Sequence, residues 1–132
     1  MEKQKIILLI EDDKLIREIY TFTLQKAGYE VLAAADGEEG IAHAKNHPDA
    51  KLIFLDVIMP EANGVEVLKK LKKDPSTAKI PVILLSNLTD DKVVDEAMKL
   101  GAAEYLVKAQ ISPSQLVDKA REILAFYANQ PQ

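Results

Sequence analysis

Four apolar runs of this sequence each end on polar side chains that could take part in chemistry. The runs and the residues that follow them are 6–10 with Glu11 and Asp12, 52–55 with Asp56, 82–85 with Ser86, and 105–107 with Lys108. If the runs are parallel strands, these side chains lie along one edge of a sheet. Carboxylates, a hydroxyl and an ammonium at such an edge are suited to bind a divalent cation and a phosphoryl group.

The three acids favour a hard metal ion. Carboxylates held close together repel one another, which raises the pKa of at least one of them unless a cation compensates. Because Glu11, Asp12 and Asp56 offer only oxygen, and the chain contains no cysteine, we expect Mg²⁺, or Mn²⁺ in its place. The structural alternative is that Asp12, Asp13 and Asp56 only cap the helices and loops that follow their strands. Capping does not require a lysine opposite, so it does not explain the whole set. Asp13 is the exception, and we expect it to cap the first helix.

The elements that must position these side chains alternate as strand and helix five times. Strands are predicted at about 5–10, 29–35, 51–55, 80–85 and 103–107. Helices are predicted at about 13–27, from Asp36 to near Pro48, between Gly64 and Pro75, from Thr89 or Asp90 to Gly101, and from Ser112 to Tyr127. This alternation predicts a doubly wound, flavodoxin-like α/β fold with a parallel sheet in the order 2-1-3-4-5. Ligands of such folds bind where the strand order reverses, here between strands one and three.

Length, charge and composition bound the function. The 132 residues predict a single domain, with its core at about 5–127. A net charge of −4 with no block of Lys or Arg argues against direct binding to nucleic acid. No apolar run is long enough to cross a membrane, and the first residues lack the apolar core of a signal peptide. We therefore expect a cytoplasmic protein.

The whole pattern resembles the receiver domain of bacterial two-component response regulators. The family has an acidic pair after strand one, a phosphorylated aspartate after strand three, Ser or Thr after strand four, and lysine after strand five. All are met in order, and the segments 55–60 and 63–64 resemble the family's phosphorylation loop. The resemblance implies that Asp56 is the phosphoacceptor and that Glu11 and Asp12 bind the metal, together with the backbone carbonyl of Ile58.

The resemblance also assigns roles in signalling. Ser86 would hydrogen-bond a phosphoryl oxygen, and Lys108 would pair with the phosphoryl group or, before transfer, with Asp56. Tyr105 matches an aromatic switch residue that turns inward when the hydroxyl of Ser86 moves. The donor would be a histidine kinase, a phosphotransfer protein or a small phosphodonor. The output would pass through helix four, strand five and helix five to a protein target, or to an effector domain that this chain lacks.

The sequence departs from the family pattern at three places. Ala109 follows Lys108 where the family usually has a cis proline, so we expect a trans peptide bond. Asn87 stands where the family prefers Ala or Gly beside the phosphoryl group. Ile58 and Leu88 flank the route of the attacking water, and because both are bulky and apolar we expect slow autodephosphorylation.

Two other functions compete with this interpretation. A haloacid-dehalogenase-type phosphohydrolase also uses an aspartate after a parallel strand, but it needs a second acid two residues later, where this chain has Ile58. A receiver-like module could instead bind a partner without phosphorylation. Its acidic set and Lys108 would then have no evident use.

Overall fold

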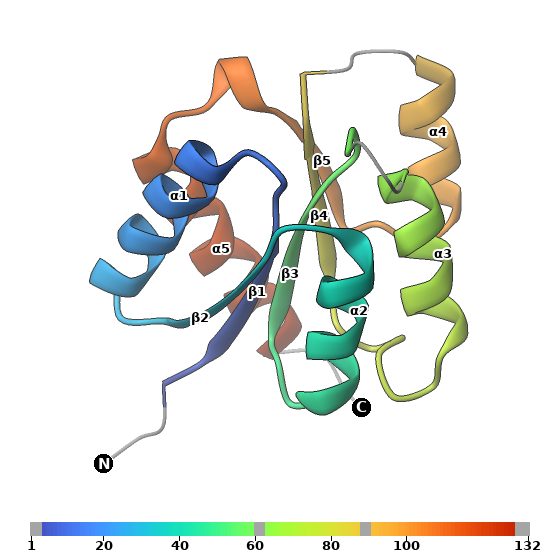
Figure 1. Ribbon diagram of the computed structural model, residues 1–132, viewed down its shortest axis with the longest axis horizontal. Helices are drawn as coiled ribbons and strands as arrows, with labels where there is room; N and C mark the ends of the chain where they lie inside the picture. Colours follow the sequence, from blue (N-terminus) through green and yellow to red (C-terminus); the bar gives the residue numbers. More distant parts are fainter. Residues whose placement is uncertain (1–3, 60–62, 88–90, 129–132) are drawn as a thin grey trace.

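The computed structural model describes residues 4–59, 63–87 and 91–128, and these form one parallel sheet with helices on both faces (Figure 1). The strands are β1 (Ile6–Ile10), β2 (Glu30–Ala34), β3 (Leu52–Asp56), β4 (Val82–Ser86) and β5 (Glu104–Val107). All pairings are parallel and the order is β2-β1-β3-β4-β5. The predicted flavodoxin-like fold and its strand order are confirmed.

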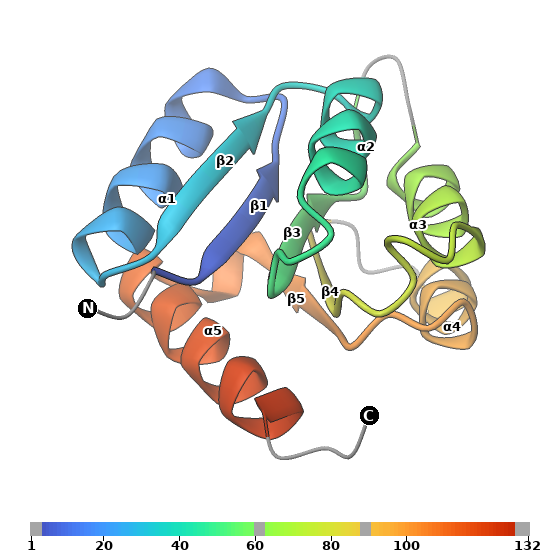
Figure 2. The same ribbon diagram turned by 90° about the horizontal axis from the view of Figure 1, so that it is seen from below.

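The helices divide between the two faces of the sheet. They are α1 (Lys14–Lys26), α2 (Gly37–Asn46), α3 (Gly64–Lys73), α4 (Asp91–Lys99) and α5 (Pro113–Ala128), with a short 3₁₀ helix, η1 (Lys108–Gln110), after β5. Figure 2 shows α1 and α5 on one face and α2, α3 and α4 on the other. The five predicted helices are confirmed, and the expected cap at Thr89 or Asp90 lies outside the described residues.

The core explains why the central strands are apolar at nearly every position. Every residue of β1, β3 and β4 is buried. Alternate side chains enter two separate clusters: Leu8 packs on the side of α2, α3 and α4, whereas Ile7 packs on the side of α1 and α5. Both faces of the sheet are therefore covered, as in other parallel sheets. Such a sheet gives the residues at its carboxyl edge a well-packed support.

Local capping fixes where the helices begin. The Asp13 side chain accepts a hydrogen bond from the Ile16 N–H at 3.0 Å, which confirms its predicted role as the cap of α1. At α5, Ser112 Oγ accepts from the Gln115 N–H at 3.2 Å and Gln115 Oε1 accepts from the Ser112 N–H at 2.7 Å. This is the capping box that the sequence predicts.

Some details of the predicted elements are wrong. Asp56 and Ser86 are the last residues of β3 and β4, not the first residues after them. Ile19 and Tyr127 fit the helical apolar period, but their exposed fractions are 41% and 42%. The helix face that contacts the sheet is narrower than the apolar stripe in the sequence.

Candidate functional site

Three acids from two neighbouring strands meet at the carboxyl edge of the sheet. The Glu11 N–H donates to the carbonyl of Ala34 at 3.0 Å, so the strand pairing continues one residue beyond β1. Asp56 ends β3, which lies directly beside β1. One carboxylate oxygen each from Glu11, Asp12 and Asp56 lies within 4.8 Å of the others. The site lies where the strand order reverses, as expected for this fold.

Lys108 joins two of these acids. Its Nζ donates to Glu11 Oε1 at 2.5 Å and to Asp56 Oδ2 at 3.0 Å. Glu11 and Asp56 are buried, and the Lys108 side chain is only 11% exposed. With little water around the charges, the attraction is stronger than in a surface ion pair, but each charge also loses hydration.

The protonation of the site follows from burial. Burial raises the pKa of Asp56 to about 7, the negative charge of Glu11 raises it as well, and Lys108 opposes both effects. Burial alone would lower the pKa of Lys108, but its contacts with Glu11 and Asp56 outweigh burial and raise the pKa. Lys108 thus remains an ammonium, and Asp56 is the member of this pair that titrates near neutral pH.

The donor set fits a divalent cation. Glu11, Asp12 and Asp56 supply only carboxylate oxygens, which Mg²⁺ and Mn²⁺ prefer. When all three acids are ionised, the single ammonium of Lys108 leaves an excess of negative charge. A cation at this place would balance that excess and favour the ionised form of Asp56.

The loop after β3 holds the Asp56 carboxylate by its other oxygen. The Ile58 N–H donates to Asp56 Oδ1 at 3.2 Å, while the Ile58 side chain is 57% exposed. The start of α3 packs tightly against this loop, since a Cβ added at Gly64 would collide with the Asp56 carbonyl oxygen and with Val57 Cα. Gly64 therefore allows the backbone of the loop and that of the helix to come close together.

The other two predicted signalling residues lie on β4 and β5. Ser86 is buried at the end of β4, one residue after Leu85, which is paired with Asp56. Tyr105 is half-buried in β5 and packs against the core cluster on the side of α4. The structure thus places Ser86 at the same sheet edge as the acids and Tyr105 deeper along the adjacent strand.

The loop after Lys108 differs from the family pattern in the expected way. The described residues contain no cis peptide bond, so Lys108 and Ala109 are joined in trans. Residues Lys108–Gln110 form η1, which the sequence did not predict. The Ala109 N–H donates to Asn87 Oδ1 at 2.9 Å.

Arg17 is a supporting residue that the sequence interpretation missed. Its Nη1 donates to the backbone carbonyls of Glu11 at 2.9 Å and Asp12 at 3.2 Å. Arg17 stands four residues after the helix cap Asp13, which directs its long side chain back over the start of α1. That spacing was the available signal, and Arg17 fixes the backbone from which two of the acids project.

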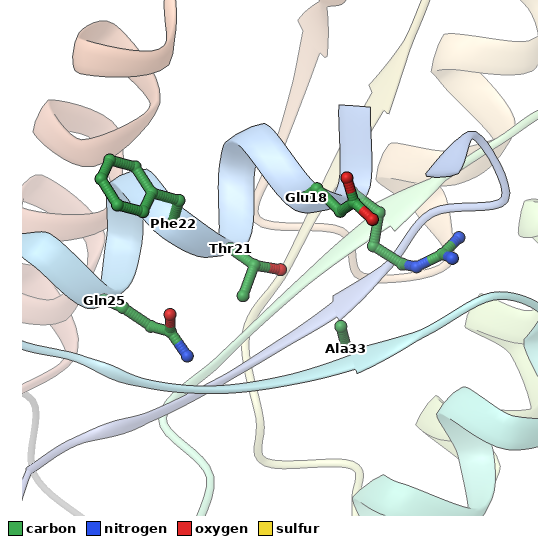
Figure 3. Close-up of a pocket in the computed structure, with 6 residues that line it drawn as sticks. Glu18, Thr21, Phe22, Gln25 and Ala33 are labelled. Carbon is green, nitrogen blue, oxygen red and sulfur yellow. The ribbon is translucent and has the colours of Figure 1, made fainter. Parts of the chain in front are cut away.

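A hollow of about 300 Å³ lies between α1 and β2, and Arg17 is among the residues that line it. Figure 3 shows Thr21 and Gln25 reaching from α1 toward the strand that carries Ala33. Within the described part of the chain, Thr21 Oγ1 is buried without a hydrogen-bond partner. Glu11, Asp12, Asp56 and Lys108 do not line this hollow, so it is not part of the candidate site.

Among the described residues, no helix combines the length and hydropathy that a membrane crossing requires.

Comparison with known proteins agrees with this geometry. The model of the response regulator receiver domain family matches residues 7–121. A probable transcriptional regulator ycf27 of Porphyridium aerugineum is 38% identical over 94% of this chain and 49% of its own length. The phosphate regulon regulatory protein PhoB of Pseudomonas aeruginosa is 35% identical over 91% of this chain and 52% of its own length. The chain thus spans about half the length of these curated relatives.

Solved structures share the whole fold. The chemotaxis protein CheY4 of Vibrio cholerae is 31% identical with a TM-score of 0.85, over 92% of this chain and 99% of that one. The Mn²⁺-bound response regulator Rcp1 is 27% identical with a TM-score of 0.76, over 97% of both chains. The BeF₃-activated receiver domain of DrrB is 27% identical with a TM-score of 0.79, over 93% of this chain and 99% of that one.

The family match covers most of the chain and includes every residue of the acidic cluster. Members of this family are signalling modules that accept a phosphoryl group from histidine kinases, and they are not enzymes in the usual sense. This chain therefore belongs to the response regulator receiver domain family of two-component signalling.

Proposed function

We propose that Asp56 accepts a phosphoryl group from a sensor histidine kinase or a histidine phosphotransfer protein. The observation that carries this proposal is the Asp56 carboxylate itself, which is buried beside two further acids and held at one oxygen by Lys108. Glu11 and Asp12, with the carbonyl of Ile58, would bind Mg²⁺ or Mn²⁺. The Mn²⁺-bound form of the similar Rcp1 supports this choice of metal.

The proposed reaction is an in-line phosphoryl transfer. A carboxylate oxygen of Asp56 attacks phosphorus while the bond from phosphorus to the donor's histidine nitrogen breaks, and the imidazole leaves with the electron pair. The product is an acyl phosphate. Negative charge builds on the three equatorial oxygens, where the Lys108 ammonium and the Ser86 hydroxyl can stabilise it. A divalent cation bound to the acids would neutralise charge on the carboxylate and on the phosphoryl oxygens.

The existing contacts prepare Asp56 for this step. Lys108 contacts Oδ2 and the Ile58 N–H contacts Oδ1, so both oxygens of the carboxylate are held before a donor arrives. Holding the nucleophile in one orientation removes part of the entropic cost of the reaction. During transfer the ammonium can shift from the carboxylate to the incoming phosphoryl group, because both carry negative charge.

We further propose that the phosphoryl group is sensed by Ser86 and Tyr105. Ser86 lies at the carboxyl end of β4, and Tyr105 lies on the neighbouring strand β5 and packs against the core on the side of α4. Strand β5 belongs to the face made by α4, β5 and α5. Movement of the Ser86 hydroxyl toward the phosphoryl group would shift the equilibrium of Tyr105 and change that face. The output would be contact with a downstream protein or an effector domain. The BeF₃-activated form of the similar DrrB receiver supports activation by a phosphoryl-like group.

The test is loading of the purified chain with acetyl phosphate and Mg²⁺, followed by intact-mass measurement. We expect one added phosphoryl group in the wild type, and none in Asp56→Asn or after removal of metal with EDTA. Asp13→Asn is the matched control, because Asp13 directly follows Glu11 and Asp12 in the chain but its side chain caps α1, a role that Asn also fills. It should load normally.

The other outcomes separate the competing functions. A wild type that gains no mass would contradict the proposal and leave the phosphorylation-independent binding module. Steady release of phosphate from monoesters, with many turnovers per chain, would support the phosphohydrolase instead.

A further inference from the structure

Two residues that depart from the family pattern contact each other. Ala109 has a backbone N–H where the family's proline would have none, and this N–H donates to Asn87 Oδ1 at 2.9 Å. The residues before them, Ser86 on β4 and Lys108 after β5, both belong to the candidate site. Asn87 and Ala109 therefore form one structural feature that joins two loops of the site.

Lys108 depends on the path of its backbone. β5 is the edge strand, and its order in the sheet places β4 between Lys108 and Asp56, with Glu11 one strand further away. Adjacent strands are about 4.8 Å apart, so the ammonium must cross roughly 10 to 14 Å of sheet edge. A lysine side chain spans only part of this distance. The backbone at Lys108 must therefore lean over the edge of the sheet toward β4.

The hydrogen bond between Ala109 and Asn87 lies where it can hold the backbone after β5 close to β4. η1 turns the chain immediately after β5, and the Ile111 N–H donates to the Lys108 carbonyl at 3.3 Å. The side chain of Asn87, which directly follows β4, draws the N–H of residue 109 toward that strand. Both Asn87 and Ala109 are exposed and belong to neither core cluster, whereas Ile111, just after η1, packs against the cluster on the side of α1 and α5. Packing therefore holds the end of this turn but not Ala109 itself.

We propose that Asn87 is a positioning residue that aims the Lys108 ammonium at Asp56 through its bond to Ala109. The inference rests on the proposed function of Asp56. It assigns the placement of the loop after Lys108 to the contact between Asn87 and Ala109. Without the bond, η1 can move away from β4, and the ammonium no longer lies against Asp56 for most of the time.

A double-mutant cycle tests whether Asn87 acts through Lys108. The measurement is the rate of Asp56 phosphorylation by acetyl phosphate at saturating Mg²⁺. We expect Asn87→Ala to slow the reaction three- to tenfold in the wild-type background and less than 1.5-fold in a Lys108→Ala background. Asn46→Ala, an exposed asparagine at the end of α2, is the control and should leave the rate unchanged. If Lys108→Ala does not fold, Lys108→Met takes its place.

Two kinetic results would overturn the proposal. The first is an unchanged rate in Asn87→Ala. The second is an equal slowing by Asn87→Ala in both backgrounds, which would mean that Asn87 acts on the reaction by a route other than Lys108.

The amide resonance of Ala109 tests the bond without any phosphoryl transfer. Asn87→Ala should move the Ala109 proton resonance upfield and speed its exchange at least threefold, and Asn87→Asp, which keeps the acceptor oxygen, should restore both. An Ala109 resonance that does not respond would overturn the inference even if Asp56 is phosphorylated. A wild type that is not phosphorylated would instead overturn the proposed function, while this resonance still reports on the contact.

Discussion

The Asp56 side chain combines the proposed chemistry with a cost in stability. Burial beside Glu11 places the Asp56 carboxylate where a bound cation can contact it. When no cation is bound, the same burial and the charge of Glu11 make the ionised carboxylate unfavourable and reduce the stability of the fold. Lys108 compensates only in part, because it is shared between Asp56 and Glu11. The stability of the metal-free chain should therefore depend on the protonation of Asp56.

The pKa of Asp56 predicts how stability changes with pH. The folded pKa is about 7, above the value of about 3.9 in an unfolded chain. The folded state then binds the extra proton, so the stabilisation is present below pH 4 and is lost as pH rises through 7. In EDTA we expect the free energy of unfolding to fall by roughly 2–4 kcal/mol over this window. Urea titrations of Asp56→Asn should show most of that slope removed, and an unchanged slope would contradict the assignment.

Removal of the Lys108 ammonium should destabilise the metal-free protein at pH 8. Lys108→Ala leaves two buried acids without their shared cation, which should cost about 3 kcal/mol. Lys119→Ala is the control, because its ion pairs with Glu104 and Glu122 lie at the surface and should cost less than about 1 kcal/mol. Chemical denaturation of the two variants compares them directly. Equal losses would mean that burial of the Lys108 pairs has no energetic consequence.

Ile58 should prolong the life of the acyl phosphate. Its side chain projects from the loop next to Asp56 and is apolar, so it offers no hydrogen bond to an attacking water. We expect a phosphoryl lifetime of at least minutes in the wild type and a several-fold shorter one in Ile58→Asn. Loss of the added mass with time measures both. A wild-type lifetime of seconds would contradict this expectation. Leu88, for which the sequence predicts the same effect, lies outside the described residues.

At the scale of elements, the β3–α3 connection positions Asp56 through Gly64. A Cβ at this position would collide with backbone atoms of Asp56 and Val57, which cannot move aside as a flexible side chain can. We expect Gly64→Ala to cost more than about 2 kcal/mol and to weaken Mg²⁺ binding, because the loop that carries Asp56 must shift.

Gly28→Ala separates this effect from ordinary strain. Gly28 has a φ of 104° but open space around its Cβ position, so alanine there should cost about 1 kcal/mol. Its Mg²⁺ affinity, measured by titration calorimetry, should equal that of the wild type. If both glycine variants bind Mg²⁺ normally, the close approach of α3 does not position Asp56.

The sheet could be predicted from the sequence because the strand signal is local. Runs such as 52–55 are apolar at every position only when both faces are covered, and helix caps such as Asp13 need only neighbours within one turn. The carboxyl edge of the sheet then follows from topology. For this reason the meeting of Glu11, Asp12 and Asp56 was predictable before any side chain was placed.

The remaining contacts depend on backbone paths that the sequence does not specify. The bond between Lys108 and Glu11 joins residues 97 positions apart. It also requires the turn at η1, which is only three residues long and therefore too short to show a helical period in the sequence. The Asn87 contact likewise depends on where the loop after β5 passes β4. Ile19 shows the opposite case, in which a correct helical period did not reveal how much of the helix face packs on the sheet.

Across the whole molecule, we expect a change at the site to reach the face formed by α4, β5 and α5. BeF₃ with Mg²⁺ should shift amide resonances across Asp91–Lys99, Glu104–Val107 and the first turns of α5 more than those of α2. Tyr105→Ala should still bind BeF₃ but lose at least half of the shift in α4, since the strand aromatic that packs against the core is gone. Shifts confined to the loops around the acids would contradict the proposed route.

The relatives differ in how much of their own length this chain covers. They extend over about twice the length of this chain and are named as transcriptional regulators, whereas CheY4 matches it along nearly its whole length. A protein target and an attached effector domain therefore both remain within the proposal. Either output requires the same first event at the sheet edge.

The most direct measurement of that event is the position of the phosphoryl group. After loading with acetyl phosphate and Mg²⁺, borohydride reduction converts an aspartyl phosphate to homoserine, which peptide fragmentation can locate. We expect homoserine at Asp56 alone, with none at Asp12 or Asp13. Homoserine at another acid, or the absence of homoserine in a chain that has bound Mg²⁺, would contradict Asp56 as the phosphoacceptor.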